Sequence, residues 1–204
     1  MYDSTFPKKY PVTTILALLN ILVFIAVSVS EHFGSGQLLY EGCLYTPAVL
    51  DGHEYYRILS AVFLHFGAEH LGSNMLALLA LGPYVENAYG KGRYVFIYLF
   101  SGAAGNLLTM AAETVSGSPA LSAGASGAVC GLLGVFFVFA LAGDSGLRRA
   151  FPVRRVLMAA ILMLIPGLTD PSVNFIAHIG GLLGGFISGW VLRRRRSRVQ
   201  GGEQ

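Results

Sequence analysis

The chain has 204 residues, of which 54% are hydrophobic and 12% charged, and its mean hydropathy is +0.60. A soluble domain of this size needs more charge to cover its surface, so the composition excludes an ordinary soluble protein and indicates a polytopic membrane protein of one domain. The net charge of +3 does not indicate a nucleic-acid partner, because the basic residues lie in short blocks beside apolar segments.

Six apolar segments approach the length of about 20 helical residues that a bilayer core requires. The predicted fold is therefore an all-α polytopic bundle of six transmembrane helices. It forms one domain over 12–192, preceded by a segment 1–11 and followed by a basic tail 193–204. The first span lacks a small-residue cleavage site, so it is interpreted as retained. The spans are expected at about 12–30, 70–89, 93–112, 125–142, 153–169 and 174–192.

Two regions depart from a simple succession of spans. Pro166, Gly167 and Pro171 are expected to break the helix of the fifth segment. The longest connection, about residues 31–69, is too polar to span and too rich in Leu, Phe and Tyr to be a plain linker. We therefore expect an interfacial first loop that folds at the membrane surface.

The lysine and arginine residues predict the orientation of the spans. If the N-terminal segment is cytoplasmic, all of the 14 basic residues except Arg57 fall on the inner side, as the positive-inside rule requires. The basic tail would then lie beside the anionic lipid of the bilayer. The basic residues of the inner side are Lys8, Lys9, Lys91, Arg93, Arg148, Arg149, Arg154, Arg155, Arg193, Arg194, Arg195, Arg196 and Arg198.

Four polar side chains fall at one level of this predicted bundle. His70 and Asn74 lie four residues apart, on one helical face near the start of the second span. Ser126 starts the fourth span, and His178 lies about one turn into the sixth. With a cytoplasmic N-terminus all three of these spans begin on the outer side, so the four residues indicate one polar cavity open to the outside.

The chemistry that such a cavity favours is nucleophilic. An imidazole can activate the Ser126 hydroxyl, and nearby donors and the helix N-terminus can stabilise an oxyanion. The alternative is that Ser126 is a small residue that lets two helices pack closely. Small faces at helical spacing serve both interpretations, because close backbones also let a short serine side chain reach an imidazole. These faces consist of Gly127, Gly131 and Gly134 on the fourth span and Gly181, Gly185 and Gly189 on the sixth.

Other reactive side chains receive no catalytic role. Cys43 lies in a polar segment and Cys130 in an apolar one, so we expect no disulfide between them and no cysteine metal site. His32, His53 and His65 lie in or near the outer loop and are assigned no function.

At these residues the chain resembles the rhomboid intramembrane serine proteases. The matching motifs are GASG with Ser126, AHIGGLLGG with His178, HLGSN with His70 and Asn74, and LGPYVENAYGKGRY with Glu86. Their order and spacing match as well, over about residues 10–192. A single GxSG motif is shared with soluble hydrolases, whereas four motifs in order on six spans are specific.

The resemblance implies a Ser126–His178 dyad without a third acidic member, acting through an acyl-enzyme. It also implies that His70, the Asn74 side chain and the Ser126 backbone N–H hold the oxyanion. The implied partners are single-pass membrane proteins, cut near the outer end of their helices, and the lipid bilayer; no cofactor or metal is implied. Structural support is expected from Gly124, Gly127, Gly131, Gly181, Gly185, Glu86 and Arg57.

The chain departs from the family pattern at two positions. The first-loop motif is usually Trp-Arg, and here it reads Tyr56-Arg57. Cys130 stands where the family commonly has an aromatic residue against the catalytic imidazole, which leaves open what supports His178. Cys130 is interpreted as a packing residue, because a thiol one turn deeper has no evident base.

Four other functions are weighed against the serine protease. A zinc protease needs an HExxH motif, and no second ligand follows Glu69-His70 at that spacing. An aspartyl protease needs two adjacent carboxylates, but Asp144 and Asp170 are predicted on opposite sides. A catalytically silent rhomboid-like protein that binds membrane helices would lack Ser126 or His178, and a transporter would carry polar residues along its whole path.

The expected location is a bacterial inner membrane with both termini cytoplasmic.

Overall fold

The computed structural model describes residues 5–34, 37–170 and 173–193. Within these ranges the chain forms helices and no strand, and a single antiparallel bridge pairs Leu44 with Ser122. In chain order the helices are α1 (Phe6–Lys9), α2 (Pro11–His32), α3 (Gln37–Gly42), α4 (Thr46–Leu50), α5 (Arg57–Ser60), the 3-10 turn η1 (Ala61–Phe63), α6 (Ala68–Tyr89), α7 (Lys91–Ser116), α8 (Ser126–Ala142), α9 (Ser145–Ala150), α10 (Val153–Leu164), α11 (Pro166–Thr169) and α12 (Phe175–Leu192).

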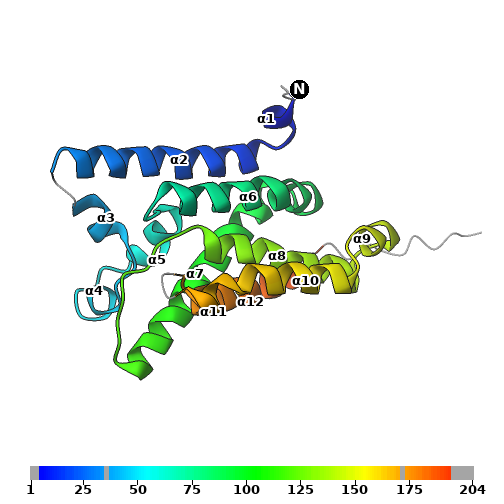
Figure 1. The fold of residues 1–204 in the computed structure, drawn as a ribbon. Coiled ribbons are helices and arrows are strands. Elements are labelled where there is room, and N and C mark those ends of the chain that lie inside the picture. Colours follow the sequence, from blue (N-terminus) through cyan, green and yellow to red (C-terminus); the bar gives the residue numbers. More distant parts are fainter. Residues whose placement is uncertain (1–4, 35–36, 171–172, 194–204) are drawn as a thin grey trace, which may run out of the picture.

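The longer helices form a bundle around α8. Helix α12 packs along both α7 and α8, while α6 contacts α2, α7 and α8. Helix α10 lies mainly against α8. Figure 1 shows the short helices α3, α4 and α5 gathered at one end of the bundle, with α1 and α9 at the other. The described part of the predicted first loop, 31–34 and 37–69, therefore lies at one end of the bundle and is largely helical.

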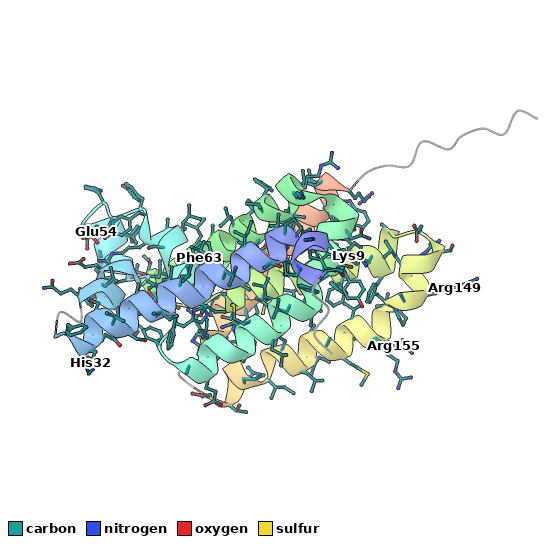
Figure 2. The ribbon with its side chains drawn as sticks, turned by 90° about the horizontal axis from the view of Figure 1, so that it is seen from above. Lys9, His32, Glu54, Phe63, Arg149 and Arg155 are labelled. Atoms are coloured by element: carbon teal, nitrogen blue, oxygen red, sulfur yellow. The ribbon has the colours of Figure 1, made fainter. Side chains whose placement is uncertain are left out.

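The two ends of the bundle differ in charge. Lys9, Arg149 and Arg155 lie toward one end of the molecule, and His32 and Glu54 lie toward the other (Figure 2). Two of the segments predicted to be cytoplasmic, at Lys9 and at 149–155, therefore lie toward the same end (Figure 2). Most of the predicted tail, residues 194–204, lies outside the described residues, as does the start of the N-terminal segment at residues 1–4.

Three of the described helices are long and apolar enough to cross a membrane, by length and composition: α2, α7 and α12. Helix α8 is apolar along its length but has 17 residues. Helix α6 has 22 residues and carries several polar side chains near its start. The count of six spans therefore stays a prediction.

The helix of the fifth apolar segment is interrupted at Pro166, as predicted. Helix α10 ends at Leu164, and the single turn α11 begins at Pro166. A proline lacks the N–H that would continue the ladder of backbone hydrogen bonds. The continuous helix of the fifth segment is therefore α10, whose 12 residues are fewer than the predicted span 153–169. Pro171, the other predicted breaker, lies outside the described residues.

Glycines set the spacing between α8 and α12. A Cβ atom on Gly181 would overlap the carbonyl oxygen of Gly127, and a Cβ on Gly185 would overlap that of Gly131. A side chain at either position would push the helices apart, so the two backbones are in direct contact. This contact aligns the first turns of α8 and α12, which carry Ser126 and His178.

A buried carboxylate fixes α6 against the start of α2. Oε1 of Glu86 accepts the Val12 N–H at 3.0 Å, and Oε2 accepts the Thr13 N–H at 2.9 Å and its hydroxyl at 2.8 Å. The first backbone N–H groups of a helix lack internal partners, and the helix dipole favours a negative charge there. Glu86 therefore caps α2 and lies far from the cavity described below.

Candidate active site

A cavity of about 1,080 Å³ opens among the N-terminal ends of α6, α8 and α12. The cavity is lined by the first turns of α6, α8 and α12. The C-terminal half of α7 completes its wall. All four polar residues singled out in the sequence line this cavity: His70, Asn74, Ser126 and His178. Residues that are far apart in the chain thus meet at one end of three helices.

The backbone before Ser126 is tied to the first loop at three successive points. Leu44 and Ser122 exchange both N–H to carbonyl hydrogen bonds, at 2.8 and 3.0 Å. The Gly124 N–H donates to the Ala61 carbonyl at 2.9 Å. The Ala125 N–H donates to Nε2 of His65 at 3.4 Å. The segment that carries Ser126 into α8 is therefore held by the first loop.

Gly124 is required at this turn for two reasons. Its φ is +146°, a conformation that residues with a side chain rarely adopt. A Cβ atom there would also lie 2.8 Å from Nε2 of His70 and 3.5 Å from Oγ of Ser126. The imidazole of His70 and the hydroxyl of Ser126 thus approach the same point beside Gly124, which places a hydrogen-bonding ring close to the serine.

Ser126 and His178 share the cavity but form no hydrogen bond with each other in the described part of the chain. They are brought together by the residues next to them, because a Cβ on Gly127 would lie 3.4 Å from the Ala177 carbonyl oxygen. Catalytic hydrogen bonds are often long in an empty site and shorten when substrate binds. The two side chains therefore lie on adjacent helix starts without a direct hydrogen bond between them.

His178 is buried, with 6% of its surface exposed. Its Nδ1 is buried without a hydrogen-bond partner among the described residues, and no aromatic ring from those residues stacks on it. Cys130, at the position where an aromatic residue was expected, is 1% exposed within α8. Cys43 and Cys130 are both free thiols. The helix that carries His178, α12, packs closely on α7 and α8.

His70 and Asn74 present polar atoms to the cavity from one face of α6. Asn74 is 5% exposed, and its side-chain nitrogen donates to the His70 carbonyl at 2.9 Å. An amide nitrogen carries a second hydrogen, which this bond does not use. Asn74 is thereby fixed in the first turns of α6 and keeps one donor for a ligand.

A polar cluster that sequence reasoning missed lies at the start of α12. The Oδ1 of Asn174 accepts the Ala177 N–H at 2.9 Å and so caps the helix. Its amide nitrogen donates to the hydroxyls of Ser122, at 2.9 Å, and Thr109, at 3.1 Å. This cluster joins α7, the segment before α8 and α12 one turn before His178. The signal in the sequence was an Asn at the start of an apolar run, which is a helix-capping pattern.

Arg57 organises the first loop from inside. Its side chain donates to the carbonyls of Tyr40, at 2.6 Å, and Cys43, at 2.9 Å, and it pairs with Glu54 at 2.5 Å. The hydrogen bonds from Arg57 and Tyr56 hold the pKa of the exposed Glu54 carboxyl below its usual range. Because Cys43 precedes the residue that pairs with the segment before α8, Arg57 supports that segment indirectly.

The comparison with known protein families agrees with these features. A family model of the Rhomboid domain matches residues 52–195. The chain belongs to the rhomboid family. The matched region of this rhomboid chain runs from the first loop to the end of α12 and contains Ser126, His178, His70 and Asn74.

Several relatives of this rhomboid chain are similar over most of its length. The rhomboid protease GluP of Bacillus subtilis (strain 168) is 32% identical over 186 residues, which are 91% of this chain and 36% of GluP. YdcA of the same organism is 29% identical over 199 residues, 96% of this chain and 95% of YdcA. RHOMBOID-like protein 2 of Arabidopsis thaliana is 36% identical over 152 residues, 74% of this chain and 46% of that protein.

These findings confirm the family predicted from the motifs. The rhomboid chain is an integral membrane protein built of helices, several of them apolar. It spans about a third of the length of GluP and nearly all of YdcA. The catalytic roles of the individual residues stay predictions.

Proposed function

We propose that this protein is an intramembrane serine endopeptidase. The observation that carries the proposal is that Ser126, His178, His70 and Asn74, from three helices, line one cavity at the helix N-termini. The resemblance of the chain to relatives that include the rhomboid protease GluP supports the same activity. Polar side chains within an apolar membrane bundle cost free energy, so where they cluster they commonly mark a functional site.

In the first step Oγ of Ser126 attacks the carbonyl carbon of a peptide bond while His178 takes the hydroxyl proton. The negative charge forms on the carbonyl oxygen, where the Ser126 N–H, the Asn74 amide and His70 donate to it. Collapse of this intermediate breaks the C–N bond, and His178 returns the proton to the leaving amine. The product is an acyl-enzyme on Ser126.

In the second step water attacks the acyl carbon. His178 accepts the proton of that water, the same donors hold the second oxyanion, and the proton returns to Oγ of Ser126 as the ester breaks. The cavity supplies the water, since it is lined by polar groups such as Asn174 and Thr109. His178 has no acidic partner among the described residues, so the proposed machinery is a dyad.

The proposed substrates are single-pass membrane proteins. A peptide bond in an intact helix cannot present its carbonyl to a nucleophile, because the neighbouring turns enclose it, so cleavage takes place where the substrate helix unwinds. In the proposed topology six spans leave both termini cytoplasmic and the cavity at the outer face, with the first loop at the interface. The gathering of Lys9, Arg149 and Arg155 at one end supports this orientation (Figure 2). The proposed location is a bacterial inner membrane.

The proposal is tested by expressing the chain together with a tagged single-pass membrane protein and measuring release of the cleaved outer part. Wild type should cleave, and Ser126→Ala and His178→Ala should not. Ser118→Ala, an exposed serine in the segment before α8, is the matched control and should cleave as wild type does. Cleavage by Ser126→Ala at the wild-type rate would overturn the proposal. Binding of the substrate by wild type without any cleavage would favour the silent helix-binding protein instead.

A further inference from the structure

His65 lies at a junction that no catalytic role explains. It follows the turn η1 and precedes α6, and its side chain is buried with 2% exposure. Burying an imidazole among apolar residues is unfavourable unless the ring makes specific contacts. Two such contacts are present, and each involves a part of the proposed active site.

The first contact is with the turn that carries the nucleophile. Nε2 of His65 accepts the N–H of Ala125, the residue directly before Ser126, at 3.4 Å. An imidazole nitrogen that accepts a hydrogen bond carries no proton, so the neutral ring of His65 must hold its proton on Nδ1. Burial, and then the charge of His70, lower the pKa of His65 to about 4, which keeps the acceptor available near neutral pH.

The second contact is with the ring of His70. The two imidazoles meet edge to face, with centroids 5.1 Å apart and an angle of 71° between their planes. The His70 ring also lies against Gly124, so closely that a Cβ atom on Gly124 would overlap the ring. The ring of His70 is therefore confined between His65 and the backbone of Gly124.

We propose that His65 is a positioning residue that fixes two donors of the oxyanion site at once, the His70 ring and the backbone N–H of Ser126. This inference rests on the proposed protease function. Oxyanion donors are effective only when they are held in place before the reaction, since their alignment then costs nothing during it. His65 does not line the cavity, so it acts through these two neighbours.

The test compares two substitutions of His65 that differ in one property. In His65→Gln the side-chain oxygen can still accept the Ala125 N–H, whereas His65→Leu fills similar space without an acceptor. His32→Leu, at an exposed histidine at the end of α2, is the matched control. We expect His65→Leu to lower kcat about tenfold with KM nearly unchanged, because a misaligned donor weakens binding of the transition state and not of the substrate. His65→Gln should recover most of the activity.

A wild-type kcat in His65→Leu would overturn the inference. Equal losses in the Leu and Gln variants would also overturn it, because they would show that ring packing and not the acceptor matters. Absence of cleavage by wild type would be a failure of the protease proposal and not of His65.

A second measurement needs folded protein but no cleavage assay. Nitrogen-15 NMR of histidine-labelled wild type in detergent should show one imidazole with its proton on Nδ1, unchanged between pH 8 and 5. Substitution of His65 by Gln should remove that signal. A His65 ring that carries a proton on Nε2 at pH 7 would contradict the inference, whatever the activity.

Discussion

Gly181 and Gly127 touch through their backbones, so closely that a Cβ atom on Gly181 would overlap the carbonyl oxygen of Gly127. These glycines lie three residues after His178 and one after Ser126. The contact between them therefore sets the distance between the proposed nucleophile and base.

Gly181→Ala should weaken both the fold and the activity. The added methyl group must separate α8 from α12, and overpacking of this kind typically costs about 1–3 kcal/mol. We expect a lower midpoint of thermal unfolding in detergent and a lower kcat. Gly92→Ala is the control, because nothing lies within 4 Å of a Cβ there. An unfolding midpoint and kcat of Gly181→Ala equal to those of wild type would show that α12 can shift without consequence.

Asn74→Ala should lower turnover without unfolding the protein. Loss of one oxyanion donor in a protease costs roughly 100-fold in kcat or more. Gly72→Ala adds a methyl group on the same turn of α6, where nothing lies within 4 Å of it, and should leave kcat unchanged. Steady-state cleavage and the thermal unfolding midpoint are measured together. The role of Asn74 is contradicted by unchanged turnover, or by a loss of activity that follows a loss of folded protein.

The stability of the protein should fall at acid pH in a way that depends on His65. Burial, and then the nearby charge of His70, lower the pKa of His65 from 6.5 to about 4 in the folded state. The unfolded chain then binds a proton at higher pH than the folded chain does. Stability from this group is complete above about pH 6.5 and is lost as the pH falls toward 4, by at most about 3 kcal/mol.

The check is the drop in thermal unfolding midpoint between pH 7.5 and pH 4.5. His65→Gln lacks the titrating group, so its drop should be smaller than that of wild type. His53→Gln serves as the control for an exposed histidine. Equal drops in wild type and His65→Gln would show that His65 does not take part.

Arg57 should protect Cys43 from thiol reagents. Cys43 is fully buried, and burial raises the pKa of its thiol to about 11 despite the opposing charge of Arg57. At pH 8 only about one thiol in a thousand is then ionised, and the thiolate is the reactive form. In a Cys130→Ala background, maleimide should label Cys43 slowly, and Arg57→Gln should speed labelling by opening the first loop. Arg149→Gln, an exposed arginine at the other end, should not. If maleimide labels Cys43 as slowly in Arg57→Gln as in the parent protein, the first loop stays closed without Arg57 and the prediction is wrong.

The features that follow from helical periodicity could be predicted from the sequence. Ser126 and His178 lie in the first turns of helices that start at the same end, so their common level could be inferred from chain direction alone. The close contact of Gly181 with Gly127 follows from glycines spaced at four residues on two apolar helices. The break at Pro166 follows from the chemistry of proline.

The features that depend on how the first loop folds could not be predicted. The hydrogen bond between His65 and Ala125 joins residues 60 apart in the chain, and no local pattern places a loop histidine beside a helix start. Asn174 is recognisable as a helix cap, but its bonds to Ser122 and Thr109 depend on how three segments meet. These tertiary contacts, and not periodicity, complete the site.

The central claim, that Ser126 is a nucleophile activated by His178, is tested most directly by labelling with a fluorophosphonate probe. Such a probe reacts with an activated serine hydroxyl and not with an ordinary one. The account predicts that wild type is labelled on Ser126, that Ser126→Ala is not labelled and that His178→Ala reacts far more slowly. Labelling of Ser126→Ala at the wild-type rate, or of His178→Ala as fast as wild type, would contradict it.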